Sequence, residues 1–171
     1  MNSKKSSYQK VTELPVSYKN ALYKLKYTIN YKNTENDKMS EVIEFLKENP
    51  LVYLATSGLD GNAKVRPILF YFEEDGKPYF CTANNKPMFK ELDANPNLEI
   101  TVATPEFAWL RIAGKAEFTD SIELKQKVID ANELVKALYE TGENPVFEVY
   151  TVSGKATIAD FSGEPPKTFE L

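Results

Sequence analysis

The chain has 171 residues, of which 42% are hydrophobic, 12% aromatic and 27% charged, with a formal net charge of −4. This length and composition suit one compact domain and exclude global disorder. No apolar run is long enough to span a membrane or to act as a secretion signal, so the sequence predicts a cytoplasmic protein. The sequence has no histidine and one cysteine, which excludes histidine-based triads and the common zinc sites and leaves chemistry to carboxylates, lysine, tyrosine or a bound organic cofactor.

Charge divides the chain into two regions. Residues 1–38 contain eight lysines and three acidic residues, whereas residues 39–171 contain 13 basic and 22 acidic residues. We predict a lysine-rich N-terminal extension over 1–38, with Met39 as an alternative translation start, and one domain over 39–171. The extension is either a basic arm for nucleic acid or an anionic surface, or a solvated segment with a short helix over Tyr18–Tyr27. The solvated segment is favoured, because the lysines are scattered and no arginine accompanies them. The acidic domain argues against nucleic-acid binding.

Turn residues and capping residues delimit the first elements of this domain. The expected elements are a helix that begins at the N-cap Ser40 and stops at Asn49-Pro50, a hairpin of Leu51–Thr56 and Ala63–Phe72, a turn at Asp75-Gly76, a strand over Pro78–Thr82, and a helix that begins at Pro87 and stops at Asn95-Pro96.

The second half continues with short strands around one longer helix. The expected elements are strands Leu98–Thr104 and Ala108–Phe118, a helix over Ser121–Glu140, and a hairpin of Phe147–Val152 and Ala156–Phe161 about Ser153-Gly154. Gly114 lies inside the second strand and indicates a bulge or a close backbone approach. Seven strands, mostly in hairpins and with no repeated βαβ unit, predict a small antiparallel barrel of the α+β, mainly β class.

Positive charge within the domain marks a candidate anion site. Its only arginines, Arg66 and Arg111, each lie within an apolar strand, so each faces an anion or a sheet edge, or forms an ordinary ion pair with a carboxylate. Thr82 and Lys86 flank a loop between a strand and a helix, where free backbone N–H groups favour anions. Together these residues predict a phosphate cradle.

Four sequence blocks in a fixed order identify a family. They are Arg66-Pro67-Ile68-Leu69, Tyr79-Phe80-Cys81-Thr82-Ala83-Asn84-Asn85-Lys86-Pro87, Leu92 followed by Asn95-Pro96, and Trp109-Leu110-Arg111-Ile112-Ala113-Gly114-Lys115-Ala116. With these blocks the chain, from about Met39 to Phe161, resembles the pyridoxamine 5′-phosphate oxidase-like family of FMN-binding split β-barrel proteins.

The resemblance implies a split β-barrel homodimer with FMN at its interface. The residues that it implies for FMN binding are Arg66, Pro67, Ile68, Thr82, Lys86, Trp109 and Arg111. Arg66 and Lys86 would hold the phosphate with the help of Thr82, and the backbone of Pro67 and Ile68 would run beside the isoalloxazine ring. Trp109 and Arg111 would come from the partner chain, although Trp109 could equally be a buried packing residue of the core.

The expected function is that of an FMN-dependent oxidoreductase acting on an unidentified small molecule, with no assigned catalytic side chain and no metal. Authentic pyridoxamine phosphate oxidases have an Arg-Lys pair where this chain has Pro87-Met88, and glutamine where it has Trp109. We therefore do not expect vitamin B6 oxidation. The alternatives are a non-catalytic flavin-binding or sensing module and a deazaflavin (F420)-dependent reductase. Cys81 is expected to be a small packing residue.

Overall fold

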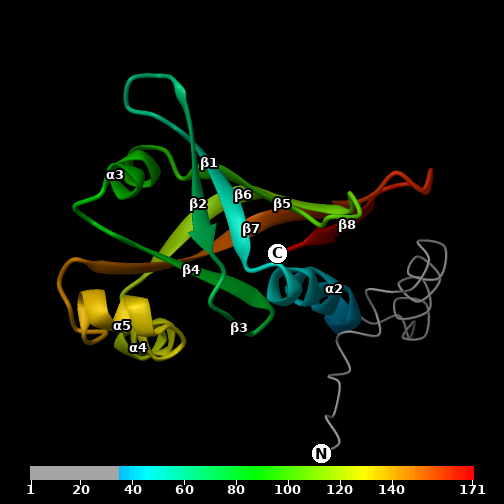
Figure 1. Ribbon diagram of the computed structural model, residues 1–171. Helices are drawn as coiled ribbons and strands as arrows, with labels where there is room; N and C mark the ends of the chain where they lie inside the picture. The colour runs from blue at the N-terminus through cyan, green and yellow to red at the C-terminus, as the bar shows by residue number, and fades with distance from the viewer. Residues whose placement is uncertain (1–34) are drawn as a thin grey trace, which may run out of the picture. The chain divides into compact units, whose positions relative to one another are not determined.

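The computed structural model describes residues 35–171, with side chains from residue 41 onward. The predicted helix Tyr18–Tyr27, and nearly all of the predicted extension 1–38, lie outside these residues. The helices are α2 (Glu35–Glu48), α3 (Pro87–Ala94), α4 (Ile122–Asp130) and α5 (Glu133–Tyr139); the strands are β1 (Leu51–Ser57), β2 (Ala63–Leu69), β3 (Phe72–Glu74), β4 (Lys77–Ala83), β5 (Asn97–Ala103), β6 (Trp109–Thr119), β7 (Phe147–Ala159) and β8 (Lys167–Glu170) (Figure 1). Within the described residues, the helices are all too short or too polar to cross a bilayer.

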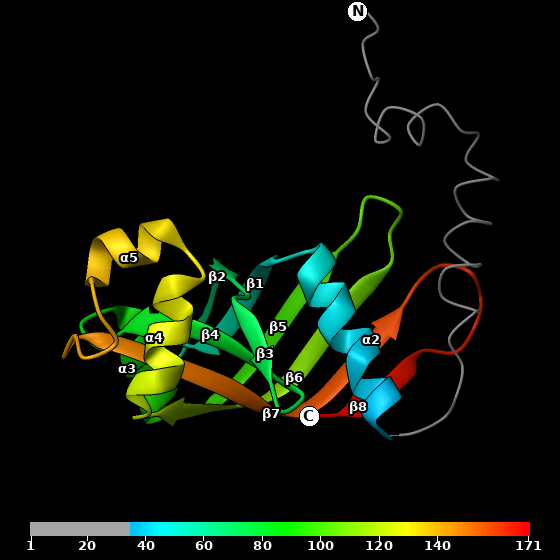
Figure 2. The ribbon, with the colours of Figure 1, turned by 90° about the horizontal axis from the view of Figure 1, so that it is seen from below.

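All eight strands join one antiparallel sheet. Its order is β2-β1-β5-β6-β7-β4-β3, and β8 pairs with the second half of β7, on the edge of β7 opposite β6. The sheet curls so that β2, at one edge, approaches β4, next to the other edge, but no ladder joins them. This arrangement confirms the predicted antiparallel split barrel of the α+β class. Both views place α3, α4 and α5 at one end of the sheet and α2 toward the other (Figures 1 and 2).

Strand alternation produces two cores. On β1 and β5, and in the first part of β6, every second residue is buried, as expected for strands with one covered face. These residues line the barrel together with apolar residues of α2 and α3, among them Val52, Leu54, Ile100, Leu110, Ile112, Leu46 and Leu92. The opposite face of β4 and β7 packs against α4 and α5 in a second cluster, which includes Val128, Ile129, Val135, Phe147 and Val149.

Three predicted boundaries were wrong. Helix α2 begins at Glu35, not at Ser40. The predicted strand Ala63–Phe72 is interrupted, because β2 ends at Leu69 and β3 starts at Phe72. The single helix predicted over Ser121–Glu140 is two helices, because Asn132 acts as a second N-cap: its side chain accepts hydrogen bonds from the backbone N–H groups of the first turn of α5.

The predicted hairpin about Ser153-Gly154 was also wrong. β7 continues through these residues as one strand, and Gly154, with φ of +153°, faces Gly114 of β6 across the ladder. A Cβ atom on either glycine would collide with the backbone of the facing strand. The predicted close approach at Gly114 is therefore confirmed, and the same approach explains why Gly154 lies within a strand. The C-terminal strand β8, which was not predicted, pairs with β7 from Lys155 to Ile158, next to Gly154.

Candidate functional site

Arg66 belongs to a buried polar network at the end of the barrel covered by α3. Its Nη1 donates a hydrogen bond to Thr56 Oγ1 (2.5 Å) and its Nη2 donates to Glu91 Oε2 (2.6 Å). The Thr56 hydroxyl in turn donates to the same Glu91 oxygen (2.6 Å). Thr56 and Glu91 are buried, and 23% of the Arg66 side chain is exposed. Of the two interpretations open for Arg66, the structure shows a carboxylate pair, whose partner Glu91 the sequence had not singled out.

Thr82 and Lys86 lie on either side of the loop between β4 and α3. Thr82 is 2% exposed, and its hydroxyl has no hydrogen-bond partner among the described residues. A buried hydroxyl without a partner is costly. Asn84 fastens the loop to the opposite strand, since its side-chain amide donates to Pro145 O (2.8 Å) and Glu148 Oε1 (3.0 Å).

Lys86 brings an exposed cation to the start of α3. It is the N-cap residue of that helix and its side chain makes no capping hydrogen bond; Pro87 follows at the first helical position. The ammonium lies 6.0 Å from the centre of the Tyr139 ring, and no carboxylate of residues 41–171 forms an ion pair with it. The first turn of α3 therefore offers uncapped N–H groups beside an unneutralised charge.

Trp109 and Arg111 lie on the outward face of β6. Leu110 and Ile112 between and beyond them are buried, whereas Arg111 is exposed and Trp109 is half-buried against Phe161, with ring centres 5.3 Å apart. The structure therefore places Arg66, Thr82 and Lys86 around α3 and leaves these two residues on a separate outer face. The resemblance assigned them to a partner chain, and that assignment stays a prediction.

Pro67 and Ile68 continue β2 beyond Arg66. Pro67 is exposed and pairs across the ladder with Tyr53, whereas Ile68 packs against the barrel core. Tyr53 is itself 48% exposed, so the pair forms an open apolar surface. A flat ring laid against this edge would meet backbone and apolar side chains.

Two groups with acid–base chemistry, Tyr71 and Cys81, lie near the start and end of the β3–β4 hairpin. Burial raises the pKa of the Cys81 thiol, with Tyr71 and Lys86 lowering it by smaller amounts. Burial likewise raises the pKa of Tyr71 well above its ordinary value. Both groups are therefore protonated at neutral pH, and neither is poised as a general base.

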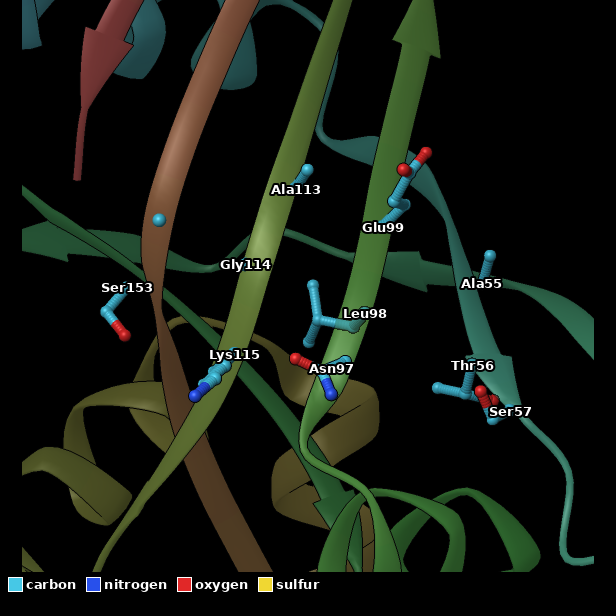
Figure 3. Close-up of a pocket in the computed structure, with 11 residues that line it drawn as sticks. Ala55, Thr56, Ser57, Asn97, Leu98, Glu99, Ala113, Gly114, Lys115 and Ser153 are labelled. Atoms are coloured by element: carbon cyan, nitrogen blue, oxygen red, sulfur yellow. The ribbon is translucent and has the colours of Figure 1, made fainter.

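A hollow of about 670 Å³ lies on the outer face of the sheet. Its floor is formed by β1, β5, β6 and β7 (Figure 3), and the lining residues Gly114 and Gly154 contribute no side chains to it. Lys115, Asn97 and Ser57 are among its polar lining residues. None of the residues predicted to bind FMN lines this hollow, and no sequence motif indicated it.

The chain matches a known protein family over most of the described residues. The sequence model of pyridoxamine 5′-phosphate oxidase matches residues 39–159. The chain belongs to this family. A comparison with curated proteins found no match.

Solved structures agree with this membership. A NimC/NimA family protein from Clostridium acetobutylicum is 34% identical, with a TM-score of 0.71, over 83% of this chain and 100% of that one. A C. acetobutylicum protein related to general stress protein 26 is 17% identical, with a TM-score of 0.61, over 81% of this chain and 97% of that one. A heme binding protein from Mycobacterium smegmatis is 16% identical, with a TM-score of 0.63, over 82% of this chain and 60% of that one. The last two share the fold. The predicted family is thus confirmed.

Proposed function

We propose that this protein binds FMN and uses it as an oxidoreductase acting on a small molecule. Members of its family commonly bind flavin. The observation that carries the proposal is the unpartnered, buried hydroxyl of Thr82 four residues before the unneutralised Lys86, at the start of α3. A hydroxyl, an ammonium and free N–H groups form the donor set that a phosphate monoester requires.

At the phosphate end, each residue has a distinct task. Lys86 supplies net positive charge, because it has no carboxylate partner among the described side chains. Thr82 and the first-turn N–H groups of α3 supply directional hydrogen bonds. Arg66 supplies N–H donors but little net charge, since Glu91 neutralises it at 2.6 Å. The residues present therefore fit a phosphate.

At the ring end, we propose that a second copy of the chain completes the site. Cross-strand pairs on the outer face of β1 and β2 set Tyr53 against Pro67 and Ala55 against Val65. Leu51, Tyr53 and Val65 are 51%, 48% and 66% exposed, an apolar concentration that favours a protein contact. In the proposed homodimer, Trp109 and Arg111 of one protomer face the FMN held by the other.

Bound FMN would supply the hydride and electron transfer, and the protein would supply placement. The outer-face apolar residues would exclude water from the ring, and Lys86 would anchor the phosphate. The chain has no histidine, and Tyr71 and Cys81 are held protonated, so none of these groups would act as the proton acceptor. The same features disfavour haem, whose usual protein ligands are histidine and the cysteine thiolate.

Flavin titration of the purified protein tests the proposal. We expect wild type to quench FMN fluorescence and to bind FMN more tightly than riboflavin, which lacks the phosphate. Lys86→Ala should weaken FMN binding about ten-fold, the loss of one charge-assisted contact of about 1.4 kcal/mol, and leave riboflavin binding unchanged. Lys90→Ala, which removes another exposed lysine of α3, is the matched control and should bind FMN as wild type does.

A turnover assay then separates an enzyme from a binding module. Flavin-loaded protein is mixed with a reduced nicotinamide and an electron acceptor, and oxidation of the nicotinamide is followed by absorbance. Turnover supports the oxidoreductase; tight FMN binding without turnover of any nicotinamide or acceptor supports the sensing module. A protein that takes up neither FMN nor riboflavin would refute flavin binding.

A further inference from the structure

We infer that Glu91 is a positioning residue that fastens Arg66 across the split of the barrel and so aligns its guanidinium for the phosphate of the ligand. The inference rests on the proposed flavin site and adds to it a residue that contacts no ligand. It follows from where Glu91 lies in the topology, from its contacts, and from the charge balance of the pair.

The first step is topological. Arg66 lies on β2, one edge of the open sheet, whereas Thr82 and Lys86 belong to the segment that joins β4, next to the other edge, to α3. No ladder connects β2 with β4. A phosphate site assembled from both edges therefore straddles the split, where backbone pairing cannot fix the separation of the two halves.

Glu91 provides a side-chain link at this split. It lies one turn into α3, on the helix that Lys86 begins, and its Oε2 accepts hydrogen bonds from Arg66 of β2 and Thr56 of β1. The carboxylate is 6% exposed, so water competes weakly for these bonds. The network thus ties the helix that carries Lys86 to the strand that carries Arg66.

The contacts also fix the direction of the guanidinium. Arginine has five N–H donors in a rigid planar fork, and two are engaged, by Thr56 and Glu91. Because both arms of the fork are held, the remaining donors keep one orientation. Arg66 and Glu91 together carry no net charge, so Arg66 contributes orientation and hydrogen bonds while Lys86 contributes the excess charge.

The test compares the affinities for FMN and for riboflavin, because only the part of the affinity that comes from the phosphate should change. Glu91→Ala should weaken FMN binding about ten-fold and leave riboflavin binding unchanged, whereas Glu91→Gln, which keeps an acceptor oxygen for Arg66, should recover most of the affinity. Glu41→Ala is the matched control, since it breaks an ion pair with Lys167 (2.8 Å) that ties α2 to β8. Amide hydrogen exchange of α3 should accelerate in Glu91→Ala and stay at the wild-type rate in Glu41→Ala.

The outcomes separate this inference from the proposed function. Wild type that binds neither flavin overturns both. Wild type that prefers FMN, with the same FMN-to-riboflavin ratio in Glu91→Ala, overturns the role of Glu91 alone. In the Arg66→Lys background, Glu91→Ala should no longer change the ratio; a further ten-fold loss there would show that Glu91 acts other than through Arg66. If Glu91→Ala does not fold, the near-isosteric Thr56→Val releases one of the two held arms of Arg66 and keeps the Arg66–Glu91 contact, so the FMN-to-riboflavin ratio should fall by less than ten-fold; an unchanged ratio would overturn the alignment of Arg66 by this network.

Discussion

The two arginines of the domain have similar sequence neighbourhoods and opposite environments. Arg66 is followed by Pro67-Ile68-Leu69 and Arg111 by Ile112-Ala113. In the structure, Arg66 shares a buried network with Thr56 and Glu91. Arg111 is exposed between Thr101 and Thr157 of the neighbouring strands, and no ion pair within residues 41–171 involves it.

The difference comes from what covers each strand. β2 is an edge strand whose Arg66 side chain meets α3, a helix that brings a carboxylate to the end of the barrel. β6 lies in the middle of the sheet, and its odd-numbered residues from Trp109 to Lys115 face outward. An arginine in an apolar strand therefore does not reveal its partner; the element packed over that face of the strand decides it.

Removing each arginine should give the largest contrast. Arg66→Ala leaves the buried Glu91 carboxylate without its counter-ion, and we expect it to lower the free energy of unfolding by about 3–5 kcal/mol. Arg111→Ala removes an exposed side chain and should change it by about 0.5 kcal/mol or less. Urea unfolding of both variants measures the difference, and a loss in Arg66→Ala as small as that expected for Arg111→Ala would mean that the Arg66 network contributes little to stability.

Replacing the whole pair should sharpen this contrast. The double variant Arg66→Met with Glu91→Leu leaves no buried charge unpaired, and buried ion pairs replaced by apolar residues are often neutral or stabilising by about 1–4 kcal/mol. We therefore expect it to regain most of the stability that Arg66→Ala loses, while its preference for FMN over riboflavin falls about ten-fold below that of wild type, because the donors of Arg66 are lost and Lys86 and Thr82 remain. A double variant as unstable as Arg66→Ala would show that packing, not charge, dominates at this position.

Much of the barrel was predictable, because its signals are local. The Asp75-Gly76 turn and the Pro87 start of α3 were predicted from two or three residues each, and both are present. The errors came from non-local effects. Ser153-Gly154 has the composition of a turn, but Gly154 is required by the approach of Gly114 forty residues earlier in the chain.

The candidate site was predictable only in part, for the same reason. Thr82 and Lys86 flank one loop, so their spacing in the sequence shows that they belong together. Glu91 was missed although it has a detectable signal: it lies three residues after Met88 and next to Leu92, on the buried face of α3. An acidic residue at such a helical spacing, in a chain with one edge-strand arginine, indicates a buried pair.

Arg111 should matter for the ligand and not for the fold. If it faces the flavin of the partner protomer, Arg111→Ala should weaken FMN binding about ten-fold, a loss of about 1.4 kcal/mol, with an unchanged urea midpoint. Fluorescence titration, with sedimentation to confirm the same oligomeric state, measures this. The exposed Lys115 of the same outer face provides the control, since Lys115→Ala should bind as wild type; equal losses in both variants would indicate a general charge effect.

Replacing Tyr150 should change the free energy of unfolding less than replacing Arg66, and it contrasts a buried group without a partner with the hydrogen-bonded Glu91. Both are polar groups in the barrel, but the Tyr150 hydroxyl is fully buried and has no partner among the described residues. Replacing it in Tyr150→Phe removes an unsatisfied group, and we expect a gain of about 1 kcal/mol in the free energy of unfolding at neutral pH. A loss would mean that the hydroxyl has a partner, such as a buried water, that stabilises it.

The pH dependence of the same variant gives an independent reading. Burial raises the pKa of Tyr150 above the ordinary value of 10.0, with Arg66 opposing this by a smaller amount. The folded state therefore holds a proton that the unfolded state releases once the pH exceeds about 10, so wild-type stability is unaffected by this group below that pH and falls above it. In Tyr150→Phe the free energy of unfolding should fall less steeply above about pH 10, by the contribution of one titrating proton, because phenylalanine does not ionise. Parallel curves for the two proteins would assign the alkaline sensitivity to another group. Tyr71, whose pKa burial also raises, is the next group to replace.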